Sequence, residues 1–102
     1  MGDYMRTEIL REIGLTDSET KVYLALLELG DSTRGEIVNK SRIAGSKIYE
    51  ILERLLDKGL ASIYIKNKVK HFKPTNPKQI LGYLEDKKQQ ISKTEKEAKS
   101  IL

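Results

Sequence analysis

The hydrophobic pattern of this chain changes its period once, at Gly59, from the spacing of a helix to that of a strand. Before Gly59, apolar residues recur at three- and four-residue intervals, most clearly in residues 22–29, which is typical of one buried helical face. After it, residues 61–66 and 69–73 are rich in β-forming side chains and alternate. The order of elements therefore predicts several helices followed by a pair of strands.

Two capping boxes place the starts of two helices. Thr16 and Glu19, and again Thr33 and Glu36, have the spacing at which each residue's side chain binds the other's backbone N–H. A glycine follows three of the expected helices, where its access to the left-handed conformation suits a helix end. The expected helices span residues 4–13, 16–29, 33–40 and 44–58.

The strand-rich segment predicts a β-hairpin with its turn at residues 67–68. Behind it, Asn76 followed by Pro77 has the form of an N-cap and a first helical residue. The helix that begins there meets no strong breaker and could extend to Leu102. The fold class predicted is mainly α with a small β-hairpin, a winged helix-turn-helix plus a long C-terminal helix.

Two units are expected on this basis. Residues 1–76 would form the winged helix-turn-helix with its N-terminal helix, and residues 77–102 would form an amphipathic dimerisation helix.

Composition argues against catalysis. The 102 residues include no cysteine and one histidine, His71, which removes most nucleophile–base pairs and metal-ligand sets. The glycines are isolated, so no phosphate-cradling motif occurs. No apolar run is long enough for a membrane span. We expect a cytoplasmic protein that is not an enzyme, needs no cofactor or metal, and does not bind a membrane.

Charge is segregated along the chain although the net charge is only +4. Residues 1–31 have a balance of −4, whereas residues 61–78 carry five lysines and no acid. Such a basic segment can meet an anionic surface, or it can be a solvated surface with chance clustering.

The segment 44–58 is the main functional candidate, because the second helix of a helix-turn-helix enters the major groove. Lys47 and Arg54 would reach guanine edges or phosphates, and Glu50 would accept from cytosine. Arg42, in the preceding turn, would contact phosphate. Tyr49 flanks the buried stripe and either packs or contacts DNA. The alternative to DNA binding is that this is the ordinary polar face of a surface helix. The residues expected to point outward are Ser46, Lys47, Glu50 and Arg54.

The hairpin adds three lysines near its tip, Lys66, Lys68 and Lys70. Like charges repel, so an anionic partner such as DNA explains their clustering through counterion release. Protection of an edge strand against aggregation is the other explanation, and the two are compatible.

The last helix fits a heptad pattern, which favours dimerisation through its apolar stripe. The N-terminal helix could assist, and folding back onto the same domain is the alternative. The a positions are Leu84, Ile91 and Ala98, and the d positions are Ile80, Lys87, Thr94 and Ile101.

Residues 15–27, together with the Ser46-Lys47-Ile48-Tyr49 run and Lys58-Gly59-Leu60, resemble the TrmB-like archaeal transcriptional regulators. The resemblance implies DNA binding by a winged-helix dimer. Family members often have proline and arginine at the positions of Ala44 and Gly45, so Arg42 or Lys47 would have to supply that charge here. Larger members carry a C-terminal sugar-sensing domain, and sugar binding is not carried over to this chain.

The function predicted is a sequence-specific, homodimeric regulator of transcription whose partner is double-stranded DNA. The alternative is a winged-helix module that binds protein within a transcription or assembly complex. The sequence leaves any small-molecule effector unidentified.

Overall fold

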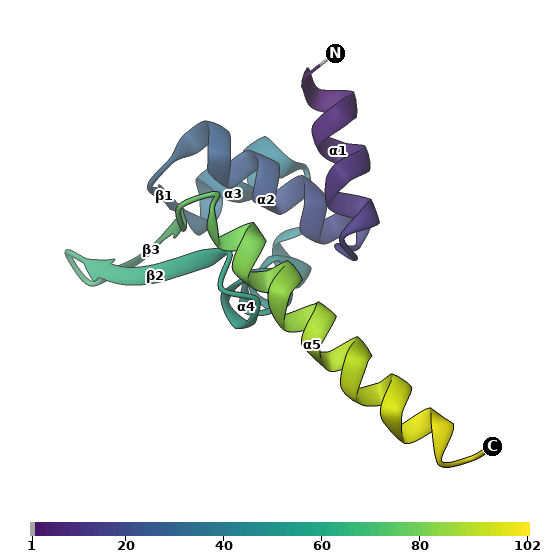
Figure 1. Cartoon of the computed structure of the whole chain (residues 1–102). Coiled ribbons are helices and arrows are strands. Elements are labelled where there is room, and N and C mark those ends of the chain that lie inside the picture. Colours follow the sequence, from purple (N-terminus) through teal and green to yellow (C-terminus); the bar gives the residue numbers. More distant parts are fainter. Residues whose placement is uncertain (1) are drawn as a thin grey trace.

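Residues 2–102 are described by the computed structural model, with side chains from residue 5 onward. The chain forms helices in the expected order and then a hairpin and a long helix (Figure 1). The helices are α1 (Gly2–Glu12), α2 (Asp17–Leu29), α3 (Arg34–Ser41), α4 (Gly45–Asp57) and α5 (Gln79–Lys99). The strands are β1 (Ser32–Thr33), β2 (Ala61–Lys66) and β3 (Val69–Pro74). The predicted winged helix-turn-helix is confirmed.

Local hydrogen bonds begin α2 and α3 where the capping boxes predicted. The Glu19 N–H donates to Thr16 Oγ1 at 3.1 Å, and the Thr16 N–H donates to Glu19 Oε1 at 2.8 Å. At α3, Glu36 Oε1 accepts from the N–H and the hydroxyl of Thr33, both at 3.0 Å. Donors that a free helix end would leave unpaired are thus satisfied by residues close in sequence.

The core lies where α2, α3, α4 and the hairpin meet. Helix α4 contributes the apolar stripe that the sequence predicted, and α2 lies across it. Burial of these side chains is the main favourable term in folding. The fully buried large residues include Tyr23, Leu26, Ile37, Ile48, Leu52, Leu55, Leu60 and Phe72.

The sheet has three antiparallel strands in the order β1-β3-β2, one strand more than expected. β1 pairs Ser32 with Phe72 and Thr33 with His71. A strand of two residues is too short to show an alternating pattern, which is why sequence reasoning missed β1. At the other end of β3, Asn67 and Lys68 both have positive φ, 51° and 65°, as in the type I′ turn of a two-residue hairpin.

Helix α5 starts close to the core and then leaves the body of the protein (Figure 1). Asn76 caps its first turn, because the Lys78 N–H donates to Asn76 Oδ1 at 2.9 Å. The regular helix runs from Gln79 to Lys99, slightly shorter than the expected 77–102. Every residue from Lys88 onward is exposed. Across residues 2–102, no helix has the length and apolarity that crossing a membrane requires.

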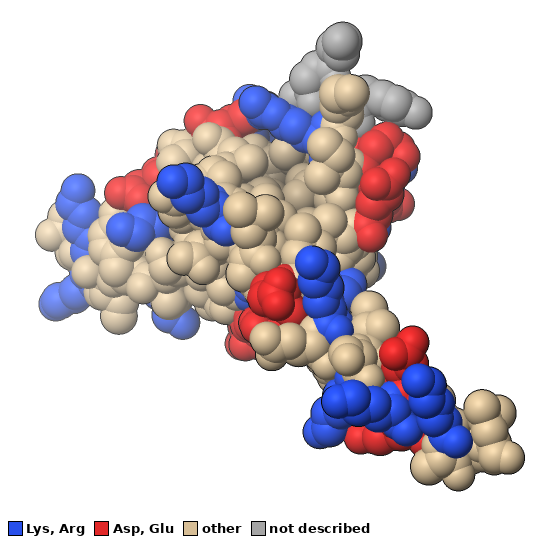
Figure 2. All heavy atoms as spheres, viewed as in Figure 1, with Lys and Arg blue, Asp and Glu red and all other residues tan. Residues whose placement is uncertain are grey.

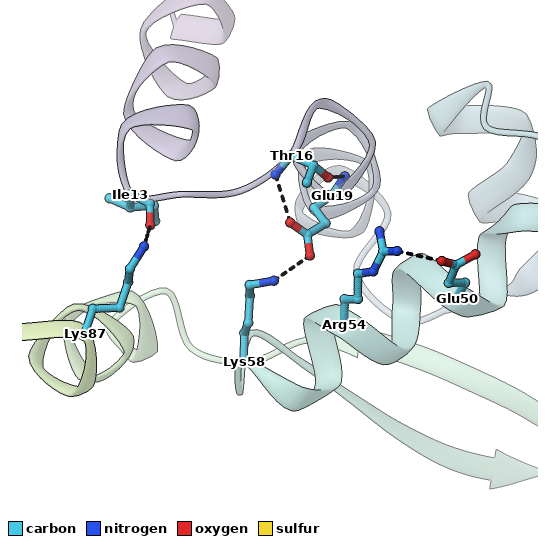
Figure 3. Close-up of polar contacts among 7 residues, drawn as sticks. All are labelled: Ile13, Thr16, Glu19, Glu50, Arg54, Lys58 and Lys87. Carbon is cyan, nitrogen blue, oxygen red and sulfur yellow. Dashed lines mark hydrogen bonds and ion pairs between the residues drawn. The ribbon is translucent and has the colours of Figure 1, made fainter. Parts of the chain in front are cut away.

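A buried ion pair joins the start of α2 to the end of α4. Lys58 Nζ lies 2.5 Å from Glu19 Oε2, and the Glu19 side chain is only 1% exposed (Figure 3). Burial raises the pKa of the Glu19 carboxyl, but hydrogen bonds from Lys58 and Thr16 and the charge of Lys58 outweigh it. The pKa of Glu19 therefore lies below its ordinary value of 4.5.

Replacement of Lys58 by methionine should lower the free energy of unfolding by about 2–3 kcal/mol at pH 7, because the Glu19 carboxylate stays buried without its cation. A carboxyl with a lowered folded-state pKa stabilises the fold above its unfolded pKa, and this contribution is lost as pH falls below about 4.5. Urea unfolding between pH 7 and pH 3 should thus show a smaller acid-induced loss for Lys58→Met than for wild type. Arg54→Met is the control, since its ion pair with Glu50 is exposed and contributes under about 1 kcal/mol. If Lys58→Met and Arg54→Met lost the same free energy of unfolding at pH 7, this role for Lys58 would be contradicted.

Candidate nucleic-acid interface

Helix α4 presents a polar face to solvent while its apolar stripe lies in the core. The sequence predicted the outward orientation of Ser46, Lys47, Glu50 and Arg54, and the structure places all four on this face. Two more side chains belong to it: Tyr49, for which the sequence left packing or DNA contact open, and the acidic Glu53, which the sequence had not singled out. The exposed residues between the two ends are Ser46, Lys47, Tyr49, Glu50, Glu53 and Arg54.

One flank of this face contains Lys47, Glu50 and Arg54 and borders a shallow hollow beside Thr16 and Ser18. Arg54 Nη2 lies 2.6 Å from Glu50 Oε1, so these two charges satisfy each other (Figure 3). Lys47 is exposed and forms no ion pair within the part of the chain that the structure describes. On this flank of α4, Lys47 is therefore the cation that is free to bind an anionic or acceptor-rich partner.

The turn between α3 and α4 holds Arg42 in the left-handed conformation, with φ of 61°. Its N–H donates to Val38 O at 2.9 Å and closes α3, and its side chain is exposed. A β-carbon makes this conformation costly for residues other than glycine. The position beside the start of α4 is where the predicted phosphate contact would lie.

Tyr49 lies on the opposite flank, where α4 faces the hairpin. Its ring packs against the buried Phe72, with centroids 6.3 Å apart, and its side chain is still 46% exposed. The Arg34 guanidinium carbon and Lys70 Nζ lie 5.4 and 5.6 Å from the Tyr49 ring centroid. The packing role that the sequence offered for Tyr49 is thus observed, and two cations gather beside its ring.

Arg34 is a residue that sequence reasoning missed. Its Nη2 donates to the backbone oxygen of Gly45 at 2.7 Å, which ties the first residue of α3 to the first residue of α4. A β-carbon at Gly45 would lie 2.7 Å from the same nitrogen. The sequence had directed attention to Arg42 and Lys47 as sources of charge near Gly45. The only feature of the sequence that could have pointed to this contact was the absence of a side chain at Gly45, 11 residues after Arg34.

The three hairpin lysines do not form one cluster. Strand register places Lys70 opposite Ile65 and on the same face as Phe72, toward α4, whereas Lys66 lies opposite Val69 on the other face. Lys68 occupies the turn itself. All three are exposed, and Figure 2 shows lysine and arginine side chains around the hairpin tip. A partner beside α4 would therefore meet Lys70 first and the tip lysines at its edge.

His71 lies on the face of the sheet opposite Phe72. Its ring stacks on Tyr64 with centroids 5.3 Å apart, and the Tyr64 hydroxyl donates to Asp31 Oδ2 at 3.0 Å. That hydrogen bond raises the pKa of Tyr64 above its ordinary value of 10.0. Among the side chains that the structure describes, from residue 5 onward, no group of three His, Asp or Glu residues is arranged to hold a metal ion.

The residues expected at a dimer interface divide along α5. Ile80 is partly buried against the core of its own domain, and Leu84 is partly buried. Beyond them, Ile91, Ala98 and Ile101 are exposed, Ile91 by 65%. The helix therefore does not fold back along its whole length. Figure 2 shows both signs of charge mixed along this projecting part.

Lys87 explains the break in the heptad pattern of α5. Its Nζ donates to the backbone oxygen of Ile13 at 2.9 Å and lies 5.4 Å from the Tyr83 ring centroid (Figure 3). Ile13 lies just after α1, where unpaired carbonyls and the helix dipole favour a cation. The lysine thus fastens the first half of α5 to its own domain, while the second half remains free.

Beside this attachment lies an apolar hollow of about 430 Å³ between α1, α2 and the start of α5. Met5 and Ile9, on α1, are exposed by 57% and 53%, and Ile9 lines the hollow. The other lining residues are Arg6, Leu10, Tyr23, Leu24, Leu27, Pro77 and Ile80.

A helix-turn-helix with a three-stranded wing, an outward polar face on α4 and lysines on the wing defines a winged-helix protein of the nucleic-acid-binding type. Comparison with known families agrees. The profile of the family described as sugar-specific transcriptional regulator TrmB matches residues 10–78. The chain belongs to the TrmB family, as the resemblance in residues 15–60 had indicated.

Two curated relatives and one solved structure show how far the likeness extends. The chain is 35% identical over 72 residues to the sugar-sensing transcriptional regulator TrmBL1 of Pyrococcus furiosus, covering 71% of this chain and 21% of the relative. It is 33% identical over 93 residues to the DNA-binding transcriptional repressor TrmBL2 of Thermococcus kodakarensis, covering 90% and 35%. A solved structure of TrmBL2, described as an archaeal chromatin protein with a novel mode of DNA binding, superposes with a TM-score of 0.79 at 29% identity, covering 98% and 38%. The chain thus spans about a fifth to a third of the length of these curated relatives.

Proposed function

We propose that this chain is a homodimeric, sequence-specific regulator of transcription that binds double-stranded DNA. The observation that carries the proposal is the exposed polar face of α4, which stands beside a lysine-bearing wing in a TrmB-family fold. In this proposal residues 1–76 bind DNA and residues 77–102 form the dimerisation helix. The protein would act in the cytoplasm.

The geometry of α4 supports insertion into the major groove. The helix has 13 residues, or roughly 20 Å of length, and the groove is wide enough to admit a helix. In helix-turn-helix proteins the first residues of this helix reach base edges. Ser46 and Lys47 occupy that position, and Glu50 lies one turn further along. Arg54 then stands near the other end, where it neutralises Glu50.

Loss of Lys47 or Glu50 should change the preferred base at one position of the binding site. A good contact between a side chain and a base edge is worth about 1–3 kcal/mol of discrimination. Selection from a randomised duplex pool, followed by sequencing, measures this preference for Lys47→Ala, Glu50→Ala and wild type. Lys21→Ala is the control, since Lys21 is exposed on α2 and borders Glu28 and Lys40 rather than the hollow beside Lys47 and Glu50. Identical preferences for all four proteins would remove Lys47 and Glu50 from the reading face.

The wing is proposed to bind phosphates through its tip lysines. If Arg42, Lys47, Lys66 and Lys68 each neutralise one phosphate, a dimer releases counterions from about eight through these residues, which together contribute about −7 to the log–log slope of affinity against salt. Lys66→Ala with Lys68→Ala should make this slope shallower by roughly three to four, with relative base preference nearly unchanged.

Fluorescence anisotropy with a labelled duplex at several salt concentrations gives the slope. The control is Lys93→Ala with Lys96→Ala, which removes the same charge from the exposed end of α5. A wing that only protects a strand edge predicts equal slopes for the wing variant and wild type. A wild-type protein that binds no duplex would instead favour the alternative of a protein-binding winged helix.

The dimer is proposed to form through the free half of α5. Ile91, Ala98 and Ile101 leave apolar surface on a helix that projects from the body, and such a stripe is stable only when it is covered. A second copy presents the same stripe, so pairing about a two-fold axis covers both at once. Met5 and Ile9 are also exposed on α1, where Ile9 lies beside the start of α5, and they offer a second apolar area that is separate from the free half of α5.

Ile91→Lys should therefore shift the protein from dimer to monomer without unfolding the domain, because Ile91 makes no core contact. Sedimentation equilibrium gives the mass, and circular dichroism confirms the fold. Gln89→Lys adds the same charge two residues earlier, on the opposite side of the helix, and should leave the dimer intact. A dimer mass for both variants would place the interface elsewhere.

A further inference from the structure

Two cations converge on one exposed tyrosine beside the start of α4. Arg34 comes from the first turn of α3, Lys70 from strand β3, and Tyr49 from α4. The guanidinium carbon and Lys70 Nζ lie 5.4 and 5.6 Å from the same ring centroid. Three elements that are distant in sequence thus bring two positive charges to one small patch, defined here as the Arg34–Tyr49–Lys70 seat.

The seat is fixed rather than loosely arranged. Tyr49 is held by its contact with the buried Phe72. Arg34 is held by its hydrogen bond to the backbone oxygen of Gly45, and the missing β-carbon at Gly45 leaves the space that the guanidinium fills. Lys70 is oriented by the register of the hairpin, which places it on the face that carries Phe72. Fixed donors lose little freedom when they bind a ligand.

The charges of the seat are not neutralised within the protein. Neither Arg34 nor Lys70 forms an ion pair in the described part of the chain, and Arg34 Nε is buried without a hydrogen-bond partner there. The carboxylate of the nearby Glu36 already accepts two hydrogen bonds from Thr33. Glu53 borders the same hollow as Tyr49 and Lys70 but forms no ion pair with Arg34 or Lys70. Two like charges without a paired acid favour an anion, and a guanidinium and an ammonium both donate to phosphate oxygens.

We infer that the Arg34–Tyr49–Lys70 seat binds one backbone phosphate of duplex DNA in each protomer, an inference that rests on the proposed function. In a helix-turn-helix the first helix crosses the sugar–phosphate backbone while the second lies in the groove. Arg34 begins that first helix and Tyr49 belongs to the second, so the seat lies where the backbone passes between groove and wing. The charge near Gly45 then comes from α3 rather than from Arg42 or Lys47.

A double-mutant cycle with a random-sequence duplex tests this assignment without knowledge of an operator. The variants are Arg34→Ala, Lys70→Ala and their combination, and the readout is the log–log slope of affinity against salt. One shared phosphate per protomer predicts that the double variant makes the slope of the dimer shallower by about two. Two independent phosphates per protomer would make the slope shallower by about four, and no phosphate contact would leave it unchanged. Either result overturns the shared seat. Lys93→Ala with Lys96→Ala controls for the loss of net charge.

A charge swap separates phosphate binding from a purely structural tie between α3 and α4. Arg34→Ala combined with Gly45→Arg sends an arginine from position 45 into the space that the guanidinium vacates, and it should regain the affinity lost in Arg34→Ala. Melting curves show whether each variant is folded. If the Arg34→Ala, Gly45→Arg variant folds but does not regain affinity for DNA, the inference is overturned. Positive charge would then not be the contribution of the seat to DNA binding.

The remaining outcomes are also decisive. Wild-type protein that binds no duplex overturns the proposed function and the inference together, whereas wild-type binding with an unchanged slope in the double variant overturns the inference alone. Titration with inorganic phosphate, followed by tyrosine NMR signals, tests the other source of the same chemistry. Saturable phosphate binding at Tyr49 that duplex DNA does not displace would assign the seat to a free anion instead.

Discussion

The burial of the apolar stripe of α4 against α2 is the constraint on which the other features depend. Four residues of α4 lie in the core, and because a helix has two faces, their burial decides which side chains meet solvent. The ion pair between Glu19 and Lys58 then joins the start of α2 to the end of α4 at the edge of the same contact. The exposed polar face of α4 is thus a consequence of core packing.

The wing and α3 complete the candidate interface by covering the flanks of α4. Phe72 enters the core and supports Tyr49, and the register that buries Phe72 also turns Lys70 toward α4. On the other side of the ring, Arg34 binds Gly45. The interface is therefore assembled from three segments, and its positive charge is set by strand register and by one small residue as much as by the number of lysines.

Helix α5 divides its residues between two tasks. Its first turns belong to the domain, since Ile80 and Tyr83 pack on the core and Lys87 binds the backbone oxygen of Ile13. Its second half projects, with Ile91 exposed. A rigid attachment of this kind would fix the distance between two DNA-binding units in a dimer, which is what the spacing of two half-sites requires.

The sequence alone determined the order of elements, because caps, glycines and hydrophobic period are local properties that neighbouring residues establish. It placed α2, α3, α4 and the hairpin, and it identified Ser46, Lys47, Glu50 and Arg54 as the outward side of α4. The tertiary structure alone decided which distant residues meet. Strand β1 exists only because Ser32 and Thr33 pair with β3, and Arg34 reaches Gly45 only because α3 packs against α4. Contacts of this kind leave no periodic signal in a single sequence, since they depend on how separate elements pack in space.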